Sequence, residues 1–138
     1  MAKVSLSTPL PVSIDQAWRL IGGFNAMPDW YPGVEKSELA DGGRVRRLQI
    51  AGGASLVERL ETFSENDHSY SYSIEQGPLP VAQYTATIRL RQEPGKPGCV
   101  VEWSSEFTPS GAPENDAVAA IRGIYQAGFD NLKKMFGG

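Results

Sequence analysis

The chain has 138 residues, enough for one domain with one hydrophobic core, and its 41% hydrophobic and 21% charged residues are typical of a globular protein. The formal net charge is −3, and Lys and Arg form no run beyond Arg46-Arg47 and Lys133-Lys134. This argues against nucleic-acid binding, which needs a basic face. The single cysteine, Cys99, excludes an internal disulfide and a cysteine-based metal site. No apolar stretch has the length of a signal peptide or a membrane span, so we expect a cytoplasmic protein without membrane insertion.

The N-terminal part of the chain predicts one strand followed by two short helices. Apolar and polar residues first alternate, as in a strand, and Pro9 and Pro11 are expected to end this pattern. Ser13 and Gln16 then have the spacing of a capping box at a helix N-terminus, and Gly22-Gly23 follows the apolar face of that helix. The expected elements are a strand at 4–7 and helices at 14–21 and 25–30.

From Val34 onward the pattern changes to the period of two that is typical of strands. The segment Ala51-Gly52-Gly53-Ala54 is a strong hairpin signal. The segment 76–80 cannot continue a strand ladder, because its two prolines lack the backbone donor. The expected strands lie at 34–39, 44–50, 55–63, 70–74, 84–91 and 99–107.

A long helix is predicted at the C-terminal end of the chain. Pro113 suits its first turn, and Glu114 and Asp116 suit the positive end of the helix dipole. An apolar stripe with helical spacing follows, formed by Ala117, Ile121, Ile124, Tyr125, Gly128, Leu132 and Met135. Because the strands are consecutive and joined by short turns, the sheet should be antiparallel, with one face buried against this helix in an α+β fold.

Several segments sharpen this architecture. They are Gly43-Arg44-Val45-Arg46, Ile50-Ala51-Gly52-Gly53, Val57-Glu58-Arg59-Leu60-Glu61, Pro78-Leu79-Pro80 with Gln83-Tyr84, and Val101-Glu102-Trp103. With the order of the elements, they resemble the helix-grip fold of the START and birch-pollen-allergen superfamily, also called SRPBCC. Within it they resemble the bacterial polyketide cyclase/dehydrase and lipid-transport branch, and they are similar to the plant abscisic-acid receptors.

The resemblance covers nearly the whole chain and implies a single START-like ligand-binding domain over 1–138. It implies a seven-stranded curved antiparallel sheet around the long C-terminal helix, with two short helices between the first two strands. It also implies an apolar cavity that binds a small ligand, with enzymes as a minority, and we expect no cofactor. The receptors carry a ligand-binding lysine on the second strand. This chain has no lysine at that place, since Lys36 lies a few residues further on, so hormone recognition is not implied.

The residues that could support nucleophilic or metal chemistry are sparse. His68 lies in a turn between Asp67 and Ser69, but neighbours in a turn rarely form a triad, so we interpret it as a solvated turn residue. Cys99 begins a strand, with no histidine base expected near it, and is interpreted as a small packed residue. One His, one Cys and scattered carboxylates give no metal-ligand spacing.

The inner face of the sheet carries two charges among apolar residues. Alternation places Arg46, Leu48 and Ile50 on one face of their strand and Leu56, Glu58 and Leu60 on the same face of the next strand. Arg46 and Glu58 are expected to lie opposite each other across the hairpin. A charged pair on an apolar face is costly unless it is paired or solvated, so it is either a salt bridge at the margin of the sheet or a polar anchor inside a cavity.

Aromatic residues are expected at inward positions, where they form either a plain core or a cavity wall: Tyr70 or Tyr72, Tyr84, Trp103, Phe107, Tyr125 and Phe129. Trp30 and Tyr31 on the short second helix lie either near a possible entrance or in a packed helix hairpin. We expect the cavity to open between the loops 51–54 and 76–80 and the last helix near Tyr125, and these loops resemble in position the gate and latch of the plant receptors. The alternative is that both loops are merely tight turns. The expected ligand-binding residues are Arg46, Leu48, Glu58, Leu60, Tyr72, Leu79, Tyr84, Trp103, Ile121 and Tyr125.

The leading functional hypothesis is binding of a small hydrophobic or aromatic molecule, such as a lipid or a polyketide-like metabolite. The alternative is a cyclase or dehydratase in which Arg46 holds an enolate-like oxygen while Glu58 or a tyrosine moves protons. A third hypothesis is a protein-interaction module that uses the outer face of the sheet. That face reads Val45, Arg47, Gln49, Arg59 and Glu61, which does not suggest an apolar patch, and the sequence leaves a protein partner open.

Overall fold

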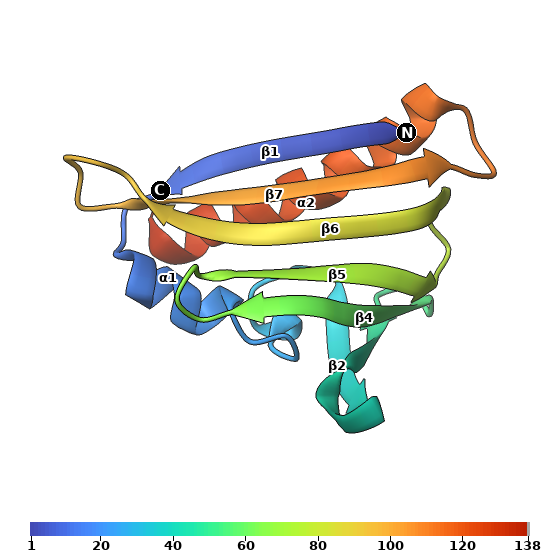
Figure 1. Ribbon diagram of the computed structural model, residues 1–138, viewed down its shortest axis with the longest axis horizontal. Helices are drawn as coiled ribbons and strands as arrows, with labels where there is room; N and C mark the ends of the chain where they lie inside the picture. The colour runs from blue at the N-terminus through green and yellow to red at the C-terminus, as the bar shows by residue number, and fades with distance from the viewer. Residues whose placement is uncertain (138) are drawn as a thin grey trace.

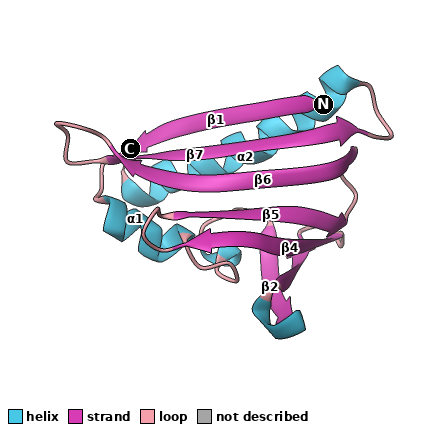
Figure 2. Ribbon diagram, in the orientation of Figure 1, coloured by secondary structure: helices cyan, strands magenta, loops and turns pink. Residues whose placement is uncertain are grey.

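The computed structural model describes residues 1–137, which form an antiparallel sheet that curves around one long helix (Figures 1 and 2). The elements are β1 (Ala2–Leu10), α1 (Ile14–Ile21), the 3-10 turn η1 (Met27–Asp29), β2 (Val34–Ala40), the 3-10 turn η2 (Asp41–Gly43), β3 (Val45–Ile50), β4 (Ser55–Ser64), β5 (Ser69–Gln76), β6 (Val81–Gln92), β7 (Cys99–Pro109) and α2 (Glu114–Phe136). The seven strands are ordered β1-β7-β6-β5-β4-β3-β2. The expected helix-grip architecture is confirmed, with α1 and η1 between the first two strands.

The first strand is longer than predicted. Pro9 lies inside β1 and is paired with Val100 of β7, so the expectation that Pro9 ends the strand is wrong. The physical reason is topological, because β1 is an edge strand and proline is tolerated where the missing donor disrupts no second ladder.

Helix α1 begins at the predicted cap. The Ser13 hydroxyl accepts a hydrogen bond from the Gln16 backbone N–H at 3.1 Å, as an N-cap side chain does. Ala17, Trp18 and Ile21 are buried and attach the helix to the sheet. The helix therefore connects the edge strand β1 to the turn η1 (Figure 1).

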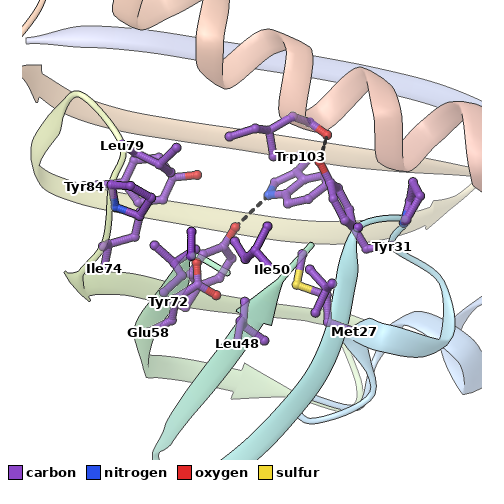
Figure 3. Close-up of a pocket in the computed structure, with 17 residues that line it drawn as sticks. Met27, Tyr31, Leu48, Ile50, Glu58, Tyr72, Ile74, Leu79, Tyr84 and Trp103 are labelled. Carbon is purple, nitrogen blue, oxygen red and sulfur yellow. Dashed lines mark hydrogen bonds between the residues drawn. The ribbon is translucent and has the colours of Figure 1, made fainter. Parts of the chain in front are cut away.

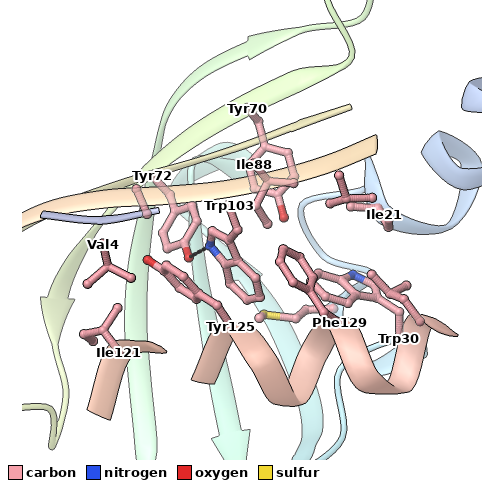
Figure 4. Close-up of a cluster of buried hydrophobic side chains, with 14 of the residues drawn as sticks. Val4, Ile21, Trp30, Tyr70, Tyr72, Ile88, Trp103, Ile121, Tyr125 and Phe129 are labelled. Carbon is pink, nitrogen blue, oxygen red and sulfur yellow. Dashed lines mark hydrogen bonds between the residues drawn. The ribbon is translucent and has the colours of Figure 1, made fainter. Parts of the chain in front are cut away.

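Helix α2 runs behind β1, β7 and β6 and covers the concave face of the sheet (Figure 1). Its buried residues are Ala117, Ile121, Tyr125, Gly128, Phe129 and Leu132. They meet the aromatic core of the sheet, where Trp103 of β7 lies directly against Tyr125 (Figure 4). Met135 was expected in the apolar stripe but is 46% exposed, since Phe136, four residues after Leu132, packs against the core in the last turn instead.

The strand register confirms the predicted alternation on β3 and β4. Arg46 pairs with Glu58 and Leu48 pairs with Leu56, and all four side chains are buried on the concave side. Bulges interrupt β4 after Val57 and after Leu60, and bulges bend the strand that carries them. The sheet therefore leaves space between this part of its concave face and α2.

Candidate ligand-binding site

A cavity of about 350 Å³ lies on the concave side of the sheet (Figure 3). It is bounded by the strands β3 to β7, by the segment 27–34 and by α2. This volume is at the low end of the range for small-molecule sites, about 300–1,000 Å³. Its wall consists of Met27, Tyr31, Pro32, Gly33, Val34, Leu48, Ile50, Ala54, Leu56, Glu58, Tyr72, Ile74, Pro78, Leu79, Tyr84, Trp103 and Ile124. The wall is mostly apolar, as in a site that recognises its ligand by shape.

The residues expected in the site divide into two groups. Those that line the cavity are Leu48, Glu58, Tyr72, Leu79, Tyr84 and Trp103. Those outside its wall are Arg46, Leu60, Ile121 and Tyr125.

Each residue in the second group has another place. Leu60 is half-buried and paired with Tyr72 across β4 and β5. Ile121 lies beside Val4 of β1 in the core (Figure 4). Tyr125 is covered by Trp103, and Arg46 lies behind Glu58.

Part of the wall comes from the segment 27–34, which the sequence reasoning did not include in the site. Tyr31, which the sequence placed only near a possible entrance, donates a hydrogen bond from its hydroxyl to the Ile124 carbonyl at 2.7 Å and so ties this segment to α2. Burial raises the pKa of Tyr31 to about 12. The signal that could have found this wall is the apolar and aromatic content of Met27, Trp30 and Tyr31, which exceeds what a surface turn needs.

The two loops expected to form the entrance contribute to the wall. Ala54 lies at the end of one loop, and Pro78 and Leu79 belong to the other. Gly52 and Gly53 both have φ of 97°, a conformation that only glycine adopts readily. The nearest contribution from α2 is Ile124 rather than Tyr125, because Tyr125 points into the core. That these loops form the entrance stays a prediction.

The cavity wall carries few polar groups, and they cluster on β4 to β7. The Trp103 indole Nε1 donates to the Tyr72 hydroxyl at 3.0 Å (Figure 3). The Tyr84 hydroxyl is hydrogen-bonded to the Tyr125 hydroxyl behind the wall. Burial raises the pKa of Tyr72 and of Tyr84 well above 10, so both are neutral donors at physiological pH.

Glu58 is the one wall residue with a formal charge, and it is paired with Arg46. The Arg46 Nε and Nη2 atoms lie 2.8 and 2.7 Å from Glu58 Oε1, and Arg46 Nη1 donates to the Phe24 carbonyl at 2.6 Å. Arg46 and Glu58 are 0% and 3% exposed, so the pair is not a solvated salt bridge at the margin of the sheet. Burial raises the pKa of the Glu58 carboxyl, and the attraction of Arg46 offsets only part of this rise.

His68 and Cys99 lie away from the cavity. The His68 side chain is only 23% exposed, so its interpretation as a solvated turn residue is corrected: its ring meets Trp18 of α1 edge-on, and its Nε2 lies 3.5 Å from an Asp15 oxygen. Cys99 is a buried free cysteine opposite Leu10, a packed residue as expected. Within residues 1–137, no group of three or more His, Cys, Asp or Glu side chains is arranged to hold a metal ion.

A curved seven-stranded sheet that grips a long C-terminal helix defines a helix-grip domain of the SRPBCC class. The model of the family described as "Polyketide cyclase / dehydrase and lipid transport" matches residues 1–137, so the chain belongs to this family. The resemblance noted in the sequence is thereby confirmed. A search of curated proteins found no match.

Solved structures agree with this assignment. The chain is 40% identical to the protein XoxI from Bacillus cereus, with a TM-score of 0.95 and coverage of 99% of this chain and 96% of the other. It is 39% identical to an uncharacterized protein from Bacillus thuringiensis, with a TM-score of 0.96 and coverage of 99% and 100%. A START superfamily protein from Mycobacterium smegmatis shares the fold at 12% identity, with a TM-score of 0.79 and coverage of 98% and 97%. In the part of the chain that the structure describes, neither helix has the length and hydropathy needed to cross a membrane.

Proposed function

We propose that this protein binds a small, mostly apolar ligand in the cavity between the sheet and α2. The observation that carries the proposal is the cavity itself, an apolar space of about 350 Å³ with a few convergent polar groups. Apolar surface that a ligand buries there contributes about 25 cal/mol per Å² before the costs of association. The low volume favours a ligand of two or three fused or linked rings, or one of similar size, over a long-chain lipid.

The test uses the neutral fluorescent probe N-phenyl-1-naphthylamine, whose emission rises in an apolar site. Wild-type protein should enhance its emission with saturable binding. Ile50→Trp, which adds bulk to the cavity wall, should weaken probe binding by about tenfold or more, because a filled cavity loses the apolar contacts of the probe. Leu39→Trp is the matched control, since Leu39 is exposed on β2 and does not line the cavity.

Equal probe binding by wild type, Ile50→Trp and Leu39→Trp would contradict the proposal. Native mass spectrometry of freshly purified protein adds an independent readout. A co-purified ligand should be present in the wild-type and Leu39→Trp proteins and absent from Ile50→Trp.

The second candidate is a cyclase or dehydratase that acts on a ligand in the same cavity. The observation that favours it is the carboxyl of Glu58 in the cavity wall, whose pKa is raised by burial as in many proton-transferring groups. Arg46 does not line the cavity, so the version in which Arg46 holds an enolate-like oxygen is not supported. The discriminating measurement is mass spectrometry of the bound ligand after incubation with wild type and with the double variant Arg46→Met/Glu58→Gln, which removes the carboxyl without leaving the buried guanidinium unpaired. A product formed only by wild type would favour the enzyme.

The outer face of the sheet gives the protein-interaction hypothesis little support. The depression on that face is lined by charged residues such as Asp41, Arg47 and Arg59. The large apolar side chains exposed within residues 1–137 are few and come from different parts of the chain: Met1, Leu39 of β2, Phe63 of β4 and Met135 of α2. Scattered apolar residues of this kind are normal on a protein surface.

A further inference from the structure

The two members of the buried Arg46–Glu58 pair differ in whether they reach the cavity. Glu58 is part of the cavity wall, whereas Arg46 is not. The two residues are direct partners across β3 and β4, so the difference arises from the direction in which each side chain ends. A ligand in the cavity therefore meets the acceptor of the pair and not the donor.

Arg46 is buried beside Glu58, where its Nε and Nη1 atoms donate hydrogen bonds and its Nη2 atom makes only an ion-pair contact. Its Nε and Nη2 atoms approach Glu58, and its Nη1 atom donates to the Phe24 carbonyl. Aromatic rings surround the rest of the guanidinium, with Cζ lying 4.3 Å from the Phe24 ring centroid, 5.1 Å from that of Tyr72 and 5.9 Å from that of Tyr70. The Arg46 side chain is 0% exposed and is not part of the cavity wall, so a ligand carboxylate or phosphate in the cavity does not meet the guanidinium.

Glu58, by contrast, keeps an acceptor available. Both Arg46 contacts go to Oε1, and Oε2 accepts no hydrogen bond from any side chain or backbone group in residues 1–137. Beside it on the wall, the Tyr72 hydroxyl already accepts from Trp103 Nε1, which leaves its own proton free to donate (Figure 3). The polar corner of the cavity thus offers one carboxylate acceptor and one phenol donor, which together match a hydroxyl group, because a hydroxyl both donates and accepts.

We infer that the cavity selects neutral ligands that carry a hydroxyl group, a phenol or an alcohol, and rejects carboxylates and other anions. This inference rests on the proposed ligand-binding function. A ligand hydroxyl would satisfy the free oxygen of Glu58 with a charge-assisted hydrogen bond. A ligand anion would lie beside a carboxylate in an apolar space, where like charges repel strongly and little water screens them. A ligand cation would compete with Arg46 for the carboxylate of Glu58.

The test compares three molecules with the same ring system and different polar groups: naphthalene, 2-naphthol and 2-naphthoate. Each displaces N-phenyl-1-naphthylamine from the wild-type protein at neutral pH. We expect 2-naphthol to bind about tenfold or more tightly than naphthalene, as a hydrogen bond to a charged group allows. We expect 2-naphthoate to bind more weakly than naphthalene. Displacement by 2-naphthoate equal to or better than that by 2-naphthol would overturn the inference, and so would a 2-naphthol that gains nothing over naphthalene.

A double variant assigns the effect to the charged pair. Glu58→Gln alone leaves the guanidinium buried without its counter-charge and can unfold the protein, so Arg46→Met is combined with Glu58→Gln to remove both charges. In this double variant, with native far-UV circular dichroism as the control, the penalty on 2-naphthoate should disappear. An unchanged order of the three molecules would overturn the assignment to Glu58. The proposed function is tested separately. It fails if the wild-type protein does not bind N-phenyl-1-naphthylamine, or if wild type, Ile50→Trp and Leu39→Trp bind it equally, whatever the order of the three molecules.

Discussion

The indole of Trp103 on β7 stacks on the phenol ring of Tyr125 on α2, with ring centroids 4.2 Å apart and planes inclined by 18°. The same indole lines the cavity and donates its N–H to Tyr72. The contact that attaches the helix to the sheet is therefore also part of the cavity wall. A change in how α2 packs should change ligand binding as well as stability.

The close approach of α2 to this wall depends on Gly128. A Cβ atom added at Gly128 would lie 3.0 Å from Tyr31 and 3.1 Å from Trp103, which is tighter than an ordinary contact. We expect Gly128→Ala to destabilise the protein by about 1–3 kcal/mol, because overpacking outweighs the better helix propensity of alanine. The measurement is the midpoint of urea unfolding, followed by probe binding, which should also weaken.

Gly123 in the same helix is the matched control. A Cβ atom at Gly123 would meet nothing within 4 Å. Gly123→Ala should therefore stabilise the protein by about 0.5–1 kcal/mol through helix propensity alone. Equal effects of the two substitutions would show that the approach of α2 does not depend on Gly128.

All five tyrosines of the chain should resist ionisation in the folded protein. Burial raises the pKa of each of them above the ordinary value of 10: Tyr31, Tyr70, Tyr72, Tyr84 and Tyr125. The folded chain therefore keeps phenolic protons that the unfolded chain releases near pH 10. Their contribution to the free energy of unfolding is complete below pH 10 and is lost as the pH rises above it, toward and beyond the pKa of about 12 of Tyr31.

Absorbance of the phenolate at 295 nm, recorded with far-UV circular dichroism, checks this expectation. Phenolate should appear in one cooperative step that coincides with the loss of secondary structure above pH 10. Tyr31→Phe should reduce the amplitude of the step without creating an earlier one. Phenolate formation near pH 10 with intact secondary structure would mean that at least one tyrosine is solvated in the folded state.

The buried pair should cost more to break than to remove. Glu58→Leu leaves the Arg46 guanidinium buried without its counter-charge, and we expect a loss of about 3–5 kcal/mol in the free energy of unfolding. Arg46→Met combined with Glu58→Leu should be close to wild type or more stable, by up to about 4 kcal/mol. The exposed pair Lys36–Glu38 is the control, since Lys36→Ala should leave the midpoint of urea unfolding nearly unchanged. If the double variant is as unstable as Glu58→Leu, the instability does not come from the unpaired charge of Arg46, and the prediction is wrong.

The loops 51–54 and 76–80 should respond to the ligand. Ala54, Pro78 and Leu79 lie in the cavity wall, and Gly52 and Gly53 carry no side chains that would hold the first loop in place. We expect N-phenyl-1-naphthylamine to slow backbone hydrogen exchange in both loops, because loops on a rigid scaffold commonly gate a site. The loop 93–98, which connects β6 and β7, is the internal control, and its hydrogen exchange should not change. Protection confined to regions other than 51–54 and 76–80 would place the entrance elsewhere.

Local patterns in the sequence were enough to predict the order of the elements and the direction of the side chains on β3 and β4. Alternation along residues 44–60 predicted that Arg46 and Glu58 face each other on the buried side, and the register confirms it. The Ser13 cap and the apolar stripe of the last helix were also readable, because both depend on residues a few positions apart. Pro9 was misread, because whether a strand tolerates proline depends on its place in the sheet, which is not a local property.

Only the tertiary structure decided which inward residues line the cavity and which belong to the core. Glu58 and Arg46 are cross-strand partners, yet only Glu58 reaches the cavity, because Phe24 and two tyrosines enclose the guanidinium from elements far apart in the sequence. Tyr31 and Ile124 both line the cavity, and a hydrogen bond joins these two residues although they are 93 positions apart in the sequence. Alternation assigns a side chain to a face, but a cavity is what the curvature of the sheet and the placement of α2 leave unfilled, and both arise from packing over the whole chain.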